Sequence, residues 1–173
     1  MKMARLVVVS LIALLLLQSN SCRVKYDFTG GRKFDDSVTV SVMTFTNNAP
    51  LAKATLPQTV SESLRDVLQR QTRLKLVPSG GDLNYEGQIT GYNVTPVAIT
   101  AGGTDQAALN RLTMTINVKF TDNVDEKFSF ESSFSRFADF PSSRNLSEVE
   151  DQLIKEITDQ LVQDIMNKSI NAW

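Results

Sequence analysis

The feature that most constrains the fold is a run in which apolar and polar side chains alternate without a break. The apolar members of this run are Leu112, Met114, Ile116, Val118 and Phe120. Successive side chains of a β-strand point to opposite faces, so the alternation predicts a strand with one buried face and one wet face. The polar members that would form the wet face are Arg111, Thr113, Thr115, Asn117 and Lys119.

Further segments of the chain also have strand character, and they cover residues 38–45, 74–77, 83–99 and 128–134. Gly87 and Gly91 lie inside the longest of these and predict a bulge or a close approach of another segment. The last segment follows an acidic turn, so we expect it to form an antiparallel hairpin with the alternating strand.

Two segments show the apolar spacing of amphipathic helices. The first runs from about Thr55 to Thr72, and Thr55 with Gln58 has the spacing of a capping box. The second begins near Asn145 and continues toward the C-terminus, with acidic residues in its first turn, where the helix dipole favours them. Asn145 with Glu148, or Ser147 with Glu150, would cap it.

The second helix has an apolar stripe made of Leu146, Val149, Leu153, Ile157, Leu161 and Ile165. On its polar side we expect ion pairs four residues apart, Asp151 with Lys155 and Asp164 with Lys168.

The order of these elements, with an apolar stripe on one side of each, predicts the α+β class. We expect a two-layer sandwich in which two helices pack on one face of a mixed, mostly antiparallel sheet of four to five strands. The opening strand, helix and strand predict two parallel strands joined by a right-handed crossover.

The first 22 residues have the layout of an export signal. Lys2 and Arg5 form a basic head, residues 6–17 are apolar apart from one serine, and polar residues lead to Cys22, the only cysteine in the chain. A single thiol cannot form an internal disulfide, so we expect cleavage before Cys22 and lipidation of Cys22. Ser19 stands where lipoprotein signals usually have an aliphatic residue, and an ordinary secretory signal is the alternative. The apolar run of 12 residues is shorter than the ~20 needed to span a bilayer.

The chain is therefore divided into a signal peptide at residues 1–21, a lipidated N-terminus and tether at 22–37, and a single domain at 38–173. The part after the signal has 152 residues, enough to bury a core.

Composition excludes several function classes. The chain has no histidine, and its only cysteine is the predicted lipidation site, which excludes histidine–cysteine metal sites and histidine-based triads. The mature part has 16 basic and 19 acidic residues and no basic tract, so nucleic acid is not an expected partner. We expect no metal, no cofactor and no catalytic residues.

Taken in order, these segments resemble the lipopolysaccharide-assembly lipoprotein family, LptE. The resemblance rests on the signal with its cysteine, on residues 82–92, 108–114 and 134–140, and on the acidic start of the last helix. It implies a non-enzymatic, lipid-anchored protein on the periplasmic face of the outer membrane. It also implies that the protein plugs and helps to assemble a large β-barrel partner, LptD, and contacts lipopolysaccharide during delivery to the cell surface.

Lipopolysaccharide carries phosphates, which guanidinium groups bind with paired donors. The resemblance therefore makes Arg111, Lys119 and Arg136 candidate lipopolysaccharide contacts, and ordinary surface charge is the alternative reading of all three.

Phe134, Phe137 and Phe140 recur at intervals of three, and we expect them to seal the sheet against the last helix. Two other functions stay open from the sequence. One is a pilotin-like accessory of another envelope secretion complex, and the other is a carboxylate-dependent hydrolase.

Overall fold

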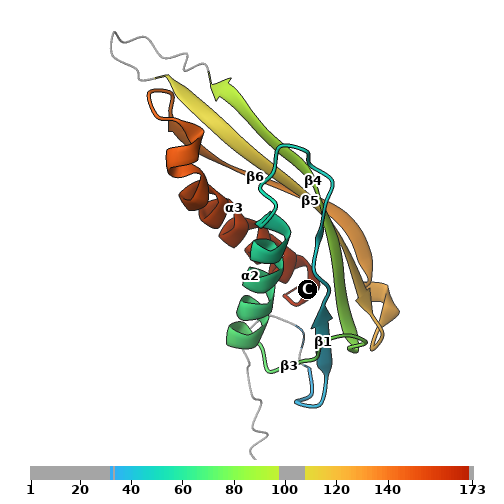
Figure 1. Ribbon diagram of the computed structural model, residues 1–173. Coiled ribbons are helices and arrows are strands. Elements are labelled where there is room, and N and C mark those ends of the chain that lie inside the picture. Colours follow the sequence, from blue (N-terminus) through green and yellow to red (C-terminus); the bar gives the residue numbers. More distant parts are fainter. Residues whose placement is uncertain (1–31, 33, 98–107, 172–173) are drawn as a thin grey trace, which may run out of the picture. The chain divides into compact units, whose positions relative to one another are not determined.

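The computed structural model describes Arg32, residues 34–97 and residues 108–171 (Figure 1). The predicted export signal and Cys22 lie outside these residues. The elements follow in the order β1 (Thr39–Val42), β2 (Thr46–Asn47), α2 (Leu56–Gln71), β3 (Lys75–Leu76), β4 (Leu83–Val97), β5 (Leu109–Asp122), the short 3-10 helix η1 (Glu126–Phe128), β6 (Phe130–Pro141) and α3 (Leu146–Ser169).

The strands form one mixed sheet in the order β3-β1-β4-β5-β6, and β2 pairs with β4 beside this path. β1 is parallel to both β3 and β4, whereas β4, β5 and β6 are long and antiparallel to one another. The predicted α+β class and the parallel pairing of the strands on either side of α2 are confirmed. The sheet has six strands, more than the four to five expected, because the two-residue strand β2 joins it separately.

Both helices lie on the same side of the sheet (Figure 1). α3 packs on β5 and β6, while α2 packs on β1, β2 and β3 and also touches α3. The apolar members of the alternation in β5 are all buried beneath them. The buried stripe of α3 includes Val149, Leu153, Ile157, Leu161 and Ile165, as its spacing predicts.

The glycines of β4 mark two local departures from a regular strand. The register of β4 against β5 shifts between Ile89 and Gly91, so a bulge interrupts the strand as predicted. A Cβ atom at Gly87 would lie 2.6 Å from the ring of Phe45. Only glycine therefore lets this ring pack directly on the backbone of β4.

Helix capping differs from the sequence prediction. Thr55 and Asn145 occupy the N-cap positions of α2 and α3, but neither side chain bonds to a backbone N–H there. The Asn145 amide instead donates to the Glu148 carboxylate at 3.3 Å. The residues that start the helices were predicted correctly, but the capping-box bonds were not.

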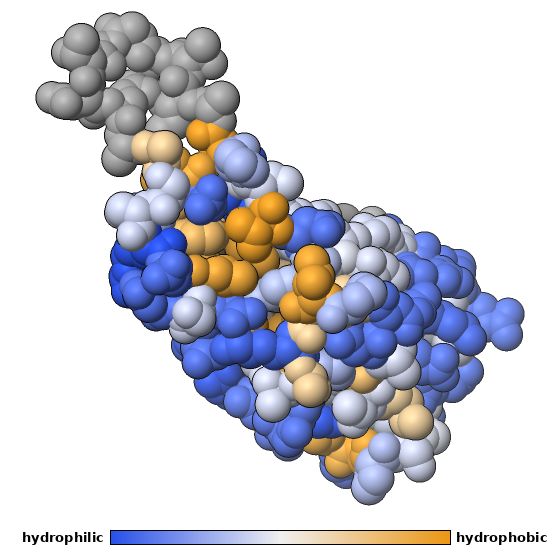
Figure 2. All heavy atoms as spheres, turned by 45° about the horizontal axis from the view of Figure 1, so that its top comes forward, coloured by the Kyte–Doolittle hydropathy of each residue, from blue (hydrophilic) through white to orange (hydrophobic). Residues whose placement is uncertain are grey.

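Apolar side chains are exposed at the end of the sheet where β4 ends and β5 begins, which we call the apolar end. In Figure 2 this end is turned toward the viewer, and apolar residues gather there within a surface that is otherwise mainly hydrophilic. Val94 in β4 and Phe137 in β6 are exposed near this end.

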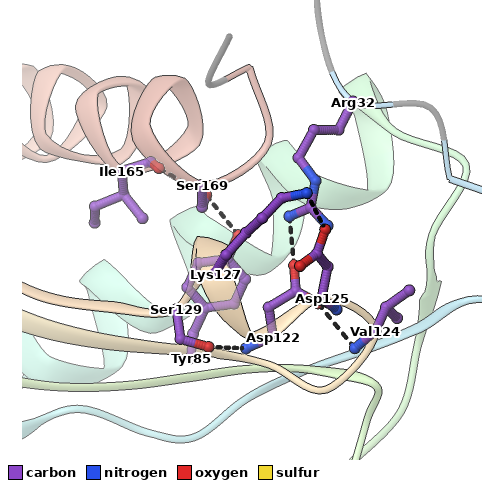
Figure 3. A network of polar contacts seen from close by, with 9 residues as sticks. All are labelled: Arg32, Tyr85, Asp122, Val124, Asp125, Lys127, Ser129, Ile165 and Ser169. Carbon is purple, nitrogen blue, oxygen red and sulfur yellow. Dashed lines mark hydrogen bonds and ion pairs between the residues drawn. The ribbon is translucent and has the colours of Figure 1, made fainter.

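At the C-terminal end of β5, Arg32 forms an ion pair with the buried carboxylate of Asp122 (Figure 3). The Arg32 guanidinium donates to Asp122, whose side chain is 0 % exposed. Asp122 also accepts hydrogen bonds from the backbone N–H groups of Val124 and Asp125, at 2.9 and 2.8 Å. The guanidinium stacks on the ring of Phe128 at 3.9 Å. These contacts hold Arg32 against the domain.

Nearby, the hydroxyl of the buried Tyr85 donates to Ser169 Oγ at 2.7 Å, and Ser169 Oγ donates to the Ile165 carbonyl at 2.7 Å (Figure 3). Burial raises the pKa of Tyr85. The Arg32 backbone N–H also donates to the carbonyl of Ile170, just after α3. The range read from the sequence as a tether, residues 22–37, therefore includes Arg32, which packs on the domain.

Candidate interaction face

The face of the sheet opposite the helices is polar and accessible. Along β5 its members are Arg111, Thr113, Thr115, Asn117 and Lys119, all of them partly or largely exposed. β6 adds Glu131, Ser133, Ser135, Phe137 and Asp139 to the same face, because its residues pair with those of β5 in continuous register. We call this surface the open face.

Side chains on the open face bond to one another across the strands. The hydroxyls of Thr115 and Ser135 lie 3.0 Å apart, and the Asn117 amide donates to Glu131 at 2.8 Å. These short polar side chains are accessible to water and able to exchange hydrogen bonds with a partner.

A more specific cluster lies near the apolar end of the sheet. Arg111 donates two hydrogen bonds to the Asp139 carboxylate, at 2.7 and 2.9 Å, and its guanidinium lies 3.6 Å from the centre of the Phe137 ring. The hydrogen bond from Arg111 lowers the pKa of Asp139. Phe137 is 47 % exposed, so the cluster presents an aromatic ring backed by a fixed ion pair. Aromatic residues and arginine are enriched in protein interfaces.

A hollow of about 400 Å³ opens on the same face, farther along β4 and β5. It is lined by Met43, Thr44, Thr46, Glu86, Gly87, Gln88, Asn117, Lys119 and Glu131. Lys119 is 58 % exposed and its ammonium lies 3.9 Å from the Glu86 carboxylate. Such a loose pair contributes little, so the ammonium is available to an anionic group.

The three basic residues singled out from the sequence do not form one site. Arg111 and Lys119 share the open face but lie eight residues apart along β5, which is roughly 27 Å in a strand. Arg136 lies on the other face and pairs with Asp164 of α3, at 2.5 and 2.7 Å.

The three phenylalanines of residues 134–140 also lie on different faces of the sheet. Phe140 is buried and Phe134 is partly buried under α3, as expected, but Phe137 lies on the open face. The prediction for Phe137 was wrong because residues 134–140 continue β6, where an interval of three moves a side chain to the opposite face. Recognising the longer strand would have identified Phe137 from its alternation.

Two observations bear on other kinds of site. Within residues 34–97 and 108–171, no group of three acidic, histidine or cysteine side chains could hold a metal ion. In the part of the chain that is described, no helix combines the length and apolar character needed to cross a bilayer.

Several solved structures superpose on most of this chain. The hypothetical protein CT253 of Chlamydia trachomatis superposes with a TM-score of 0.50 at 10% identity, covering 77% of this chain and 98% of that one, which supports a shared fold. A minor lipoprotein of Acinetobacter baumannii has a TM-score of 0.48 at 14% identity, over 76% and 91% of the two chains. The rare lipoprotein B of Shewanella oneidensis has a TM-score of 0.45 at 13% identity, and the match covers 73% of this chain and 91% of that one.

No match was found among curated proteins. The model of the family described as "LptE: Lipopolysaccharide-assembly", however, matches residues 37–169, which include every strand and both helices of the domain. The chain therefore belongs to the LptE lipopolysaccharide-assembly family.

Proposed function

We propose that this protein is an outer-membrane lipoprotein that plugs an LptD-like β-barrel, assists assembly of that barrel, and contacts lipopolysaccharide on its way to the cell surface. The family match over residues 37–169 is the observation that carries the proposal. The protein would act by binding and not by catalysis.

The open face supports a role inside a barrel. The lumen of a large outer-membrane barrel is polar, so a plug must present polar groups to it. Thr115, Ser135 and Asn117 provide hydroxyl and amide groups on the open face, and the Arg111–Phe137 pair provides an anchor of the kind found at interface hot spots.

Lipopolysaccharide contact is proposed for the basic residues of the same face. Lys119 lines the hollow with an accessible ammonium, and Arg111 lies toward the apolar end of the sheet. A phosphorylated lipid could thus meet cationic groups along β5. Arg136 could take part only by leaving its pair with Asp164 on the opposite face.

Anchoring is proposed through Cys22. Several acyl chains on one residue hold a protein on a membrane durably, whereas one chain binds only marginally. The anchor would keep the domain at the periplasmic face of the outer membrane. Mass spectrometry of the mature protein tests this step: a residue 22 that carries no acyl groups would remove it.

Copurification tests the partner. A tagged, full-length chain recovered from its own envelope should bring down one very large β-barrel protein in stoichiometric amount. Recovery of a secretin instead would favour the pilotin-like alternative, and recovery of neither would reject the proposed partner.

Charge removal tests the lipid contact. Arg111→Gln with Lys119→Gln should reduce capture of lipopolysaccharide several-fold, because both cations of the open face are removed. Arg136→Gln is the matched control on the other face and should leave capture unchanged. Equal capture by all variants would show that the open face does not bind the lipid.

A further inference from the structure

The last strand of the sheet leaves one long edge unpaired. β6 lies at the end of the strand order and, among the described residues, pairs only with β5. The opposite edge is β3, which has two residues, whereas β6 has 12. Residues 90–97 of β4 are also unpaired on their outer side, because β1 and β2 do not reach them, but this stretch follows a bulge and contains Pro96. The β6 edge is longer and has neither feature before its last residue, so it is the better site for an added strand.

The hydrogen-bond pattern shows which groups point to this edge. The Ser142 N–H donates to the Ala108 carbonyl at 2.9 Å, in step with the register of β5 and β6. Bonded and non-bonded pairs alternate along an antiparallel ladder, so even-numbered residues of β6 direct their backbone groups to β5. Odd-numbered residues direct theirs outward. Their outward N–H donors belong to Glu131, Ser133, Ser135, Phe137 and Asp139.

This edge has few of the devices that usually protect a sheet edge. Natural edge strands are kept from pairing by bulges, prolines, charged side chains or short length. β6 follows β5 without a register shift, contains no lysine, and has its only proline at the last position, Pro141. Two of its three charged side chains, Arg136 and Asp139, are already held in ion pairs with Asp164 and Arg111. An edge of this kind is a template for an added strand.

Aromatic side chains lie along the same strand. Phe130 and Phe134 are only partly buried beside α3, and Phe137 is exposed on the open face. A strand added to β6 would cover rings on both faces of the sheet, which would add apolar burial to the backbone hydrogen bonds.

We propose that the outer edge of β6 binds an extended segment of the barrel partner, which joins the sheet as a further strand. This inference rests on the proposed function, because it names the same partner. Only an extended polypeptide offers backbone N–H and C=O groups at the spacing of the outward backbone groups of the odd-numbered β6 residues. A closed barrel wall has no unpaired strand, so the segment comes from a loop or terminal region of that protein.

A second copy of this chain fits the edge less well. If two β6 strands paired along their full length about a two-fold axis at Ser135, Glu131 of each copy would lie opposite Asp139 of the other. Like charges directly opposite each other destabilise a strand pair, and this contact would occur twice, although Arg111 offsets part of the charge of each Asp139.

The test compares Ser133→Pro with Ser133→Ala in the full-length chain. Ser133 is exposed and its N–H points outward, so proline removes a donor from the edge without breaking a bond to β5. Alanine changes the side chain but keeps the N–H. Both variants should have the melting temperature of the wild-type chain, and Ser133→Pro alone should recover at least about tenfold less barrel protein.

Hydrogen exchange gives a second measurement that needs no variant. In the isolated wild-type chain, the amides of Ser133, Ser135 and Phe137 should exchange quickly, while those of Phe134 and Arg136 are protected. In the complex with the barrel, the odd-numbered amides should become protected as well. This measurement decides the matter if Ser133→Pro fails to fold.

Four results would overturn the inference. If wild-type chain and both variants recover the barrel equally, or if the odd-numbered amides stay unprotected in the complex, the edge is not used although the proposed function stands. If the isolated wild-type chain is a dimer that Ser133→Pro dissociates, the edge binds a second copy. If the wild-type chain recovers no barrel, both proposals fall.

Discussion

Replacing Arg32 with alanine should destabilise the domain strongly, although Arg32 lies in a range that reads as a polar tether in the sequence. Its side chain is 13 % exposed and its partner Asp122 is completely buried (Figure 3). The guanidinium also stacks on Phe34 and Phe128, at 4.7 and 3.9 Å from the ring centres. Alanine would remove all of these interactions at once.

The size of the effect follows from the interactions of the guanidinium that alanine cannot make. A hydrogen bond to a charged group contributes about 1.5–3 kcal/mol. Each cation–π contact adds roughly 0.5–1 kcal/mol. The N–H groups of Val124 and Asp125 still bond to Asp122, so the carboxylate is not left without partners. We expect a decrease of about 3 kcal/mol in the free energy of unfolding, or roughly 6–12 °C in melting temperature.

Chemical and thermal denaturation of the purified domain would measure this decrease. Arg73→Ala is the control, because Arg73 lies 3.9 Å from Asp36 in a pair whose members are both largely exposed. It should change stability by less than about 0.5 kcal/mol. If Arg32→Ala costs no more than Arg73→Ala, the residues before position 38 are a tether after all, and the reasoning from burial is wrong.

Other changes test separate parts of the structure. Gly87→Ala should cost about 1–3 kcal/mol in denaturation experiments, because its Cβ would lie 2.6 Å from the Phe45 ring; an unchanged midpoint would mean that this ring moves freely. Leu161→Ala, at a completely buried position of α3, should cost about 2–5 kcal/mol, and a cost below about 1 kcal/mol would contradict the packing of α3 on the sheet. Hydrogen bonds from the backbone N–H and hydroxyl of Thr39 lower the pKa of Asp82 in the folded protein. The ionised Asp82 carboxylate therefore stabilises the fold at pH values above its pKa in the unfolded chain, and this contribution is lost as pH falls through its lower pKa in the folded state. Asp82→Asn should therefore flatten the loss of stability in acid, and unfolding curves with unchanged pH dependence would refute this.

Much of the fold was predictable because strand alternation and helical stripes are local patterns. The alternation at Leu112–Phe120 correctly placed the core and the open face, and the stripe of α3 matched its buried residues. Gly87 and Gly91 correctly indicated a close approach and a bulge in β4. In each case the signal lies within the element that it describes.

The errors arose where tertiary contacts override local ones. Asp164 and Lys168 were expected to pair within α3, but Asp164 bonds to Arg136 and Lys168 donates to Ser132, both in β6. Lys155 pairs with Asp159 and not with Asp151. Charges on a helix have several partners within reach, and only the packing of α3 on β6 decides among them.

The candidate site was predicted only in part, because some of its features also depend on tertiary structure. The polar composition of the open face follows from the alternation in β5, but its aromatic member, Phe137, depends on how far β6 extends. Arg136 was grouped with Arg111 and Lys119 because all three are basic, and charge alone does not tell the two faces of a sheet apart.

Depleting the protein and following the folding state of the barrel tests the central claim most directly. Folded outer-membrane barrels migrate differently on gels before and after heating, so the folded fraction can be read from the shift. If the protein plugs and helps to assemble the barrel, depletion should remove the properly folded, heat-shifting form and leave lipopolysaccharide undelivered. A barrel that folds fully, with normal lipopolysaccharide at the surface of depleted cells, would contradict the account.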